Sequence, residues 1–187
     1  MLTLNDYDTA KFIRKNENKL RLHNYSFDER NSIVEKILFA YDVIDVDVLK
    51  NYDNHRKKNQ RARQKIESII QSGNALFLTL TFTDKTLSST CADYRKQEVR
   101  RFLKQNCIEY IANIDFGAKN GREHYHAVVS VKNKLDYSKW KFGALNGLKI
   151  RKNSKPIAIA KYINKLSNHA TKSTTKNSRL IYSRSNH

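Results

Sequence analysis

The sequence predicts an α+β fold: a central antiparallel sheet with helices packed on it, preceded by a helical N-terminal arm. Three observations support this fold class. Residues 75–83 alternate apolar and polar side chains with the period of two that is typical of a half-buried strand. Two further strand-like segments, 108–115 and 124–131, are close enough in sequence to form a hairpin. The segments around them have the apolar spacing of amphipathic helices.

The first part of the chain, residues 1–73, is expected to be a helical region. Its polar start, residues 1–25, is interpreted as irregular structure or a short helix. Ser26 and Glu29 then form a capping-box pattern, in which each side chain bonds the other residue's backbone N–H. Apolar residues at spacing four follow, which predicts a helix over 27–41.

A second helix is expected before the sheet. Residues 42–52 alternate acidic and apolar side chains, which is compatible with a short strand or with a helix. A basic helix is predicted over 54–71, with Asp53 or Asn54 as its N-cap and Gly73 just past its end. The boundary of the arm is therefore placed after residue 73.

The main domain is predicted to span residues 74–170 with the order strand, helix, strand, strand, helix. Its helix before the hairpin should turn Tyr94, Val99, Phe102 and Leu103 inward. A brief strand is expected at 148–150. A basic tail, 171–187, is expected to be partly disordered. The principal elements are predicted at 75–83, 92–105, 108–115, 124–131 and 157–168.

The charge of the chain favours binding to a polyanion. The net charge is +18, from 36 basic and 18 acidic residues. Residues 1–73 hold 14 Lys and Arg against 11 Asp and Glu, whereas residues 74–187 hold 22 against 7. Because this excess lies mainly in the expected sheet domain, nucleic acid is the first candidate partner and an anionic membrane the second.

Several classes of protein are disfavoured. Cys91 and Cys107 lack the C-x-x-C spacing of a zinc ribbon, and two cysteines do not make a disulfide scaffold. The sequence has no phosphate-binding G-x-x-x-x-G-K-[ST] motif, no apolar run of transmembrane length and no signal-peptide pattern at its start. The expected location is the cytoplasm, in a reducing environment.

Three side chains are predicted to form a metal site. His124 and His126 are two residues apart on a strand, so both imidazoles lie on the same face. A hairpin turning at Lys119–Gly121 would bring Asp115 beside them. A carboxylate with two imidazoles suits Mg²⁺ or Mn²⁺. Glu109 shares the strand face of Asp115 and is a reserve ligand.

Tyr162 is a candidate nucleophile. The predicted last helix has an apolar stripe that includes Ile159 and Ile163, and Tyr162 lies on the flank of this stripe. Lys165 is three residues further and therefore a neighbour on the helix surface. A cation beside a phenol favours the phenolate. Taken alone, Tyr162 is equally compatible with an ordinary tyrosine at the edge of a core.

These segments together resemble the three motifs of rolling-circle replication initiators of the HUH endonuclease superfamily. The segments are Phe77–Thr83 (FLTLTFT), Asp115–His126 (DFGAKNGREHYH) and Tyr162–Lys165 (YINK), in that order. The resemblance covers residues 75–170 and is closest to initiators of small single-stranded DNA phages and Gram-positive plasmids. It implies an HUH or RRM-like palm as the fold. Residues 1–73 match no family motif.

The resemblance implies a metal-dependent DNA endonuclease and strand transferase. His124, His126 and Asp115 would bind one Mg²⁺ or Mn²⁺. Tyr162 would attack single-stranded or hairpin origin DNA and form a 5′-phosphotyrosine link, leaving a free 3′-OH. Lys165 would assist the tyrosine or steady the phosphate. Implied partners are origin DNA and the host helicase and polymerase, in the cytoplasm of the host cell.

The sequence departs from the family pattern at two places. Tyr125 stands between the two histidines, where an aliphatic residue is common. Only one tyrosine lies in the third motif, so the chain resembles the single-tyrosine members. Tyr182 is an alternative nucleophile with an unconvincing context in the tail.

Residues for DNA binding are expected among the basic and aromatic side chains. Cations of the sheet domain would contact phosphates, and an aromatic ring would stack on unpaired bases. For Trp140, packing in the core is an equally good interpretation. The candidates are Lys119, Arg122, Arg151, Lys152, Lys155 and Trp140.

Two other functions fit part of the pattern. A single-tyrosine transposase or relaxase of the same superfamily would share the histidine pair and the tyrosine helix, although its partner residue tends to be Gln where this chain has Lys165. A non-enzymatic nucleic-acid-binding regulator would explain the charge and the sheet, but it would leave the grouping of histidines, carboxylate and tyrosine without a role.

Overall fold

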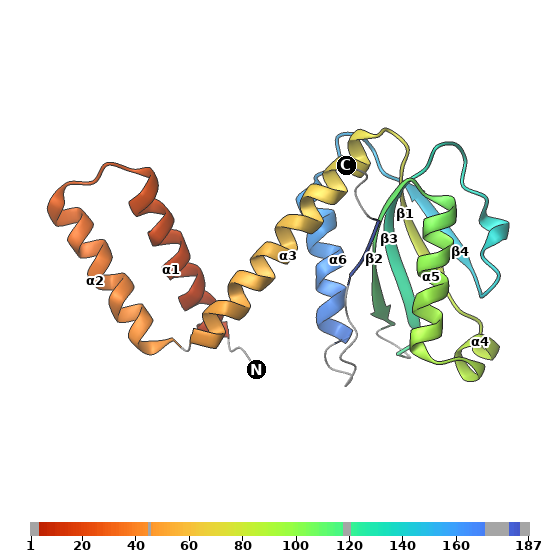
Figure 1. The fold of residues 1–187 in the computed structure, drawn as a ribbon, viewed down its shortest axis with the longest axis horizontal. Helices are drawn as coiled ribbons and strands as arrows, with labels where there is room; N and C mark the ends of the chain where they lie inside the picture. The colour runs from red at the N-terminus through yellow and green to blue at the C-terminus, as the bar shows by residue number, and fades with distance from the viewer. Residues whose placement is uncertain (1–3, 45, 118–120, 171–179, 184–187) are drawn as a thin grey trace. The chain divides into compact units, whose positions relative to one another are not determined.

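A computed structural model describes residues 4–44, 46–117, 121–170 and 180–183 of the chain; within the last helix, the side chains of residues 164–170 are outside this description. The chain divides into two compact units, residues 1–58 and 59–187. The division falls within one long helix, whereas the expected boundary after Gly73 coincides with the end of that helix. Figure 1 shows the elements of both units.

The N-terminal unit consists of helices. Helix α1 spans Leu4–Leu22, α2 spans Phe27–Val43, and α3 begins the long segment Val46–Gln71. The predicted capping box is confirmed, since Glu29 N–H donates to Ser26 Oγ and Ser26 N–H donates to the Glu29 carboxylate. The polar start therefore forms a full helix rather than irregular structure.

The open choice for residues 42–52 is resolved as helix from Val46 onward, and the prediction of a helix start at Asp53 or Asn54 is wrong. Leu49 and Tyr52 are buried in an apolar cluster with residues of α1 and α2. Asp53 accepts from the Arg14 guanidinium instead of capping a helix. Tertiary packing thus extends α3 through the expected cap.

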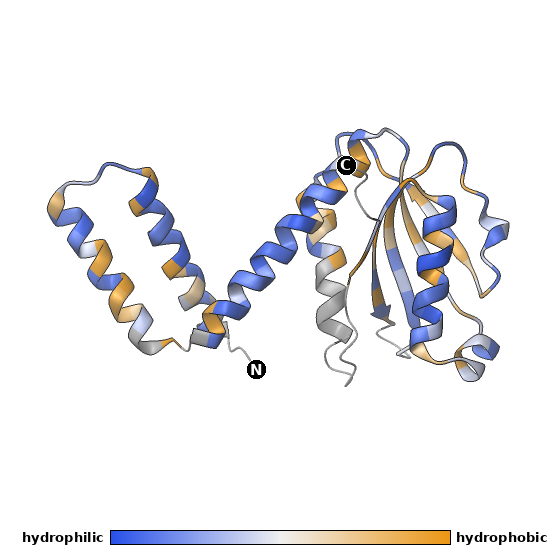
Figure 2. Cartoon of the chain, in the orientation of Figure 1, coloured by the Kyte–Doolittle hydropathy of each residue, from blue (hydrophilic) through white to orange (hydrophobic). Residues whose placement is uncertain are grey.

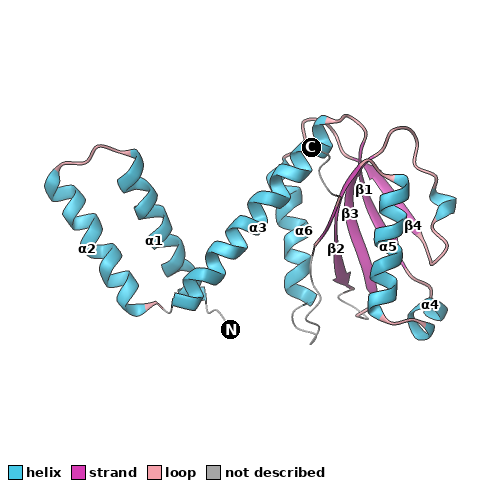
Figure 3. Ribbon diagram, in the orientation of Figure 1, coloured by secondary structure: helices cyan, strands magenta, loops and turns pink. Residues whose placement is uncertain are grey.

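The second unit contains the sheet. Its strands are β1 Ala75–Thr81, β2 Glu109–Phe116, β3 Glu123–Ser130, β4 Leu145–Lys149 and β5 Ile181–Tyr182. The strand order is β4-β1-β3-β2-β5, and every neighbouring pair is antiparallel. With its six α-helices, the described part of the chain has the predicted α+β fold (Figure 3).

The helices of this unit cover both faces of the sheet. Helix α5, Ala92–Asn106, packs its buried Val99, Phe102 and Leu103 on one face. Helix α6, Pro156–Ala170, and the second part of α3 pack on the other face, where their residues share a second apolar cluster with β1, β2 and β3. The side of α5 that is turned to the viewer is mostly hydrophilic in Figure 2, and the strands behind it are largely hydrophobic.

Some local predictions need correction. Tyr94 is 41% exposed and does not point inward, because its ring lies beside Phe142 at the margin of the core. A short helix α4, Asp84–Ser89, follows β1, where Thr83 caps it with its side chain. The edge strand β5 was also not predicted. Its two residues are too few to produce a periodic pattern, and only pairing with β2 defines it.

Candidate metal and tyrosine site

The register of the sheet brings the predicted metal ligands together. In β3, His124 lies directly opposite Asp115 of β2 and opposite Thr81 of β1. His126 follows on the same face, between Thr79 and Asn113. The hairpin that joins β2 to β3 contains Gly121 with a φ of +63°, a left-handed conformation that a glycine adopts without strain. These rows lie on the face of the sheet that α6 covers.

Asp115, His124 and His126 form a compact donor group. His124 Nε2 lies 3.1 Å from His126 Nε2 and 3.5 Å from Asp115 Oδ2. The distance from His126 Nε2 to Asp115 Oδ2 is 3.7 Å. These three side chains are the group of histidine, cysteine and carboxylate ligands that could hold a metal ion within the described residues.

Both imidazoles are held by a second hydrogen bond at Nδ1. His124 Nδ1 lies 3.0 Å from the Arg122 carbonyl oxygen, which can only accept, so the hydrogen is on Nδ1 and Nε2 carries a lone pair. His126 Nδ1 lies 3.1 Å from Thr79 Oγ1, a hydroxyl that can accept or donate. Bonds of this kind orient metal-binding histidines and select their tautomer.

The electrostatic surroundings keep His126 neutral. Burial, and then the adjacent His124, lower the pKa of His126 to about 4, although the charge of Asp115 acts in the opposite direction. A neutral imidazole is the form that binds a metal. Asp115 Oδ1 accepts the N–H of Phe116 at 2.8 Å, which leaves Oδ2 directed to the histidines.

This donor set fits a divalent cation. Around an ion with bonds of about 2.1 Å, neighbouring ligand atoms lie roughly 3 Å apart, close to the three distances in the group. With hydrogen on both Nδ1 atoms, three lone pairs converge on one point, an arrangement that a cation stabilises. Two nitrogens and one hard oxygen are compatible with Mn²⁺ or Mg²⁺, and they leave coordination positions for other oxygen ligands.

Tyr162 of α6 lies beside this group. Its ring centroid is 5.6 Å from that of His126 and 5.8 Å from that of Phe77, with edge-to-face geometry in both cases. The helix is fixed on the sheet by the buried Ile163 and by the Asn113 side-chain amide, which donates to the Ile163 carbonyl at 2.7 Å. Tyr162 itself stays 47% exposed, so its hydroxyl is open to a large substrate.

Two other predicted site residues have different outcomes. The backbone of Lys165 continues α6 one turn after Tyr162, but its side chain lies outside the described residues. The reserve ligand Glu109 is wrong as a metal ligand. Its carboxylate binds Lys65 Nζ at 2.6 Å and Ser68 Oγ at 2.8 Å, and it is six residues, about 20 Å along the strand, from Asp115.

The candidates for DNA binding do not form one surface. Arg122 is next to the donor group; it pairs with Asp84 at 2.9 Å and donates to the Phe82 carbonyl at 2.5 Å, while remaining partly exposed. Lys119 lies outside the described residues. Trp140 is only 5% exposed, so its expected stacking on bases is corrected to packing in the core, where its indole N–H donates to the Thr81 carbonyl.

The remaining three cations lie at the opposite end of the sheet. Arg151, Lys152 and Lys155 are exposed in the turn between β4 and α6. This turn follows Lys149, which pairs with Leu76 at the start of β1, whereas the donor group lies at the end of β1. Five residues of strand, about 17 Å, separate these two rows, so the cations can contact only a distant part of a bound strand.

Sequence patterns did not identify two residues that support the site. Thr79 orients His126, and Phe77 packs between His126 and Tyr162. Both lie on the correct face of the strand by alternation, but only the register with β3 shows which histidine each of them contacts.

Comparison with known proteins identifies the family. A model of the replication-associated protein family of the ORF2 type matches residues 75–178, more than half of the chain. No curated protein and no solved structure matches the chain. Within the described residues, no helix is both long and apolar enough to cross a lipid bilayer. The matched segment contains the strands, the donor group and Tyr162, and on this evidence the chain belongs to the ORF2-type family of replication-associated proteins.

Proposed function

We propose that this chain is a single-tyrosine enzyme of the HUH superfamily that initiates rolling-circle replication by cutting and rejoining single-stranded origin DNA. The observation that carries the proposal is the position of Tyr162, whose ring contacts one histidine of a three-residue metal-binding group. Membership of a replication-associated family supports the biological role. The donor group and the exposed phenol together support the cutting chemistry.

In this proposal Asp115, His124 and His126 hold one Mg²⁺ or Mn²⁺. When bound, the ion polarises the scissile phosphate and stabilises the negative charge that develops on it. One carboxylate and two neutral imidazoles leave a divalent ion with a net positive charge, which favours a phosphodiester as an additional ligand. The Arg122 carbonyl and Thr79 hold the two imidazoles in the orientation that binding requires.

Tyr162 is the nucleophile. Its Oη forms a bond to phosphorus while the bond from phosphorus to O3′ breaks, which yields a 5′-phosphotyrosine and a free 3′-OH. The phenolic proton leaves to a base, the departing O3′ takes up a proton, and Lys165 is the expected helper of the tyrosine or of the phosphate. Attack by a 3′-OH on the phosphotyrosine reverses the step and rejoins the strand.

The partners follow from these products. The free 3′-OH would prime a host polymerase, and strand separation would be the task of a host helicase, since this sequence carries no G-x-x-x-x-G-K-[ST] motif. The substrate is single-stranded or hairpin DNA, because the tyrosine must reach a backbone phosphate that lies against the donor group.

A covalent-adduct assay tests the proposal. Labelled single-stranded origin DNA from the same replicon is incubated with the protein and Mn²⁺ and analysed on a denaturing gel. We expect a protein–DNA adduct that disappears with EDTA and in Tyr162→Phe. The matched control is Tyr94→Phe, because Tyr94 has a similar exposure of 41% but lies beside Phe142 on the other face. Tight binding without any adduct would instead identify a non-enzymatic DNA-binding protein.

A further inference from the structure

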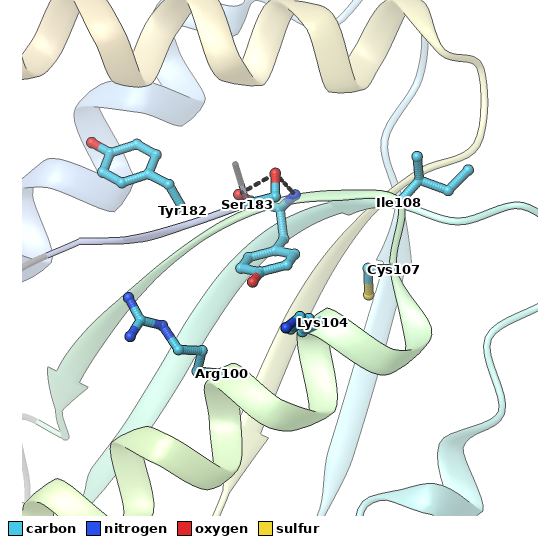
Figure 4. A pocket seen from close by; sticks show the side chains of 7 residues that line it. Arg100, Lys104, Cys107, Ile108, Tyr182 and Ser183 are labelled. Carbon is cyan, nitrogen blue, oxygen red and sulfur yellow. Dashed lines mark hydrogen bonds between the residues drawn. The ribbon is translucent and has the colours of Figure 1, made fainter. Parts of the chain in front are cut away.

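A second cavity lies on the other face of the sheet, between α5 and the strands β2 and β5. Its volume is about 500 Å³. Figure 4 shows Arg100 and Lys104 on the helix side of this cavity, and Tyr182 and Ser183 on the strand side. Tyr110 of β2 also lines it. We refer to this space as the α5 cavity.

The α5 cavity is separate from the metal and tyrosine site. Tyr110 belongs to the apolar cluster that α5 covers, whereas the donor group lies on the face that α6 covers. Tyr110 also precedes Asp115 by five residues, or about 16 Å of strand. A ligand in this cavity therefore does not touch the reacting phosphate of the proposed nicking reaction.

The charged side chains that line the α5 cavity are both positive. Arg100 and Lys104 lie one helical turn apart on α5, so their side chains are neighbours. Neither of them pairs with a carboxylate in the part of the chain that the structure describes. No described lining residue carries a carboxylate. The nearest acid in sequence, Glu109, is bound to Lys65 and Ser68 on the other face.

The hydroxyl of a buried tyrosine adds a neutral donor to these cations. Tyr110 is only 5% exposed, and its backbone N–H and C=O both bond to Ser183. Its phenolic O–H has no hydrogen-bond partner among the described residues. Buried tyrosine hydroxyls usually have one. Burial raises the pKa of Tyr110 and the charge of Arg100 opposes this rise, so the guanidinium lies near the phenol.

We propose that the α5 cavity binds the phosphate group of a nucleotide. Arg100 and Lys104 supply the charge, and the Tyr110 hydroxyl donates one hydrogen bond to a phosphate oxygen. The half-buried ring of Tyr182 forms an apolar wall for the sugar or the base. The same chemistry serves a free nucleotide and a nucleotide within a DNA strand, and the experiment below separates these two sources.

Equilibrium binding in EDTA tests this site without any cutting chemistry. The probes are thymidine 5′-monophosphate, inorganic phosphate, thymidine and a short oligothymidylate, each titrated calorimetrically into the full chain. We expect binding of the phosphate-bearing probes and none of thymidine. Binding of the monophosphate identifies a site for free nucleotides, whereas binding of the oligonucleotide alone identifies a strand contact.

Three variants assign the binding to the cavity. Arg100→Ala and Tyr110→Phe should each weaken binding by about tenfold, the usual effect of losing a hydrogen bond to a charged group. Arg101→Ala is the matched control: Arg101 carries the same charge on the same helix, does not line the cavity and pairs with Glu98 at 2.8 Å. We expect its affinity to stay within about twofold of the wild type, because only a general charge is removed.

Tyr110→Phe also separates binding from folding. The lost hydroxyl has no partner among the described residues, so the melting temperature of this variant should not fall. Equal affinities in all variants, binding of thymidine as tight as that of its monophosphate, or no binding of any phosphate-bearing probe would each overturn the proposal. These outcomes do not depend on whether Tyr162 cuts DNA, because EDTA removes the metal from every sample.

Discussion

The two faces of strand β3 differ in chemistry although their residues alternate along the same eight positions. On the face covered by α5, Tyr125 is 2% exposed and packs edge-on against Phe82. On the face covered by α6, His124 and His126 point to Asp115 and remain accessible at their margin. A closed aromatic face provides rigidity, and a polar face provides ligands, so one strand supports both the fold and the site.

The same contrast separates two tyrosines. Burial is the largest influence that raises the pKa of Tyr125 well above its usual range, while Tyr162 is half exposed beside His126. A buried phenol with a raised pKa stays protonated and cannot reach DNA. The position of a tyrosine relative to the faces of the sheet therefore decides whether it can act as a nucleophile.

The largest expected effect comes from exchanging these hydroxyl groups for hydrogen. Tyr162→Phe should reduce adduct formation by a factor on the order of 10³ or more, because it removes the attacking oxygen. Tyr125→Phe should leave the rate within about twofold, since its hydroxyl lies on the other face. Both rates are measured from the covalent protein–DNA band. If Tyr125→Phe abolished the adduct as well, the assignment of one face to chemistry would be wrong.

Truncation on the closed face should mainly affect stability. Phe82 is 1% exposed and its ring contacts Tyr125 and Trp140, so Phe82→Ala should lower the free energy of unfolding by about 3–5 kcal/mol. Urea denaturation measures this change. The counterpart is Thr79→Val, which should cost only about 1 kcal/mol but weaken Mn²⁺ binding about tenfold, because Thr79 orients His126. A large loss of stability in Thr79→Val would remove the distinction.

Metal binding should depend on the open face alone. Asp115→Asn should weaken Mn²⁺ binding by about 100-fold in calorimetry, since it removes the charged oxygen ligand of the group. Glu109→Gln on the same strand is the control and should leave Mn²⁺ affinity unchanged, because Glu109 is held by Lys65. Equal losses in the two variants would show that the ion senses the general charge of the strand and not this donor group.

The smallest effect concerns the two cysteines at the ends of α5. Burial raises the pKa of Cys107 to about 12, so only about 10⁻⁴ of this thiol is ionised at pH 8. Cys91 is exposed at the start of the helix. Iodoacetamide at pH 8 should therefore modify Cys91 first, and urea should make Cys107 reactive, as mass spectrometry of the peptides can follow. Equal labelling of the native protein would show that the closed face is open at Cys107.

Much of the sheet unit follows from local patterns. The alternation over residues 75–83, the hairpin with Gly121 and the helix after Pro156 were predicted within a few residues, because periodicity reflects which side of an element is buried. The prediction failed where burial was decided by distant residues. Helix α3 passes through Asp53 because Arg14 takes its carboxylate, and Trp140 is buried by Phe82 and Phe102.

The sequence alone determined the α+β class, the positive charge and the placement of His124 and His126 on one face of a strand, because these depend on composition and on a period of two. Only the tertiary structure decided that Asp115 faces His124, that Tyr162 contacts His126, and that Glu109 is excluded. Each of these depends on strand register and on helix docking. Both are set by packing between residues far apart in the chain, which no local pattern records.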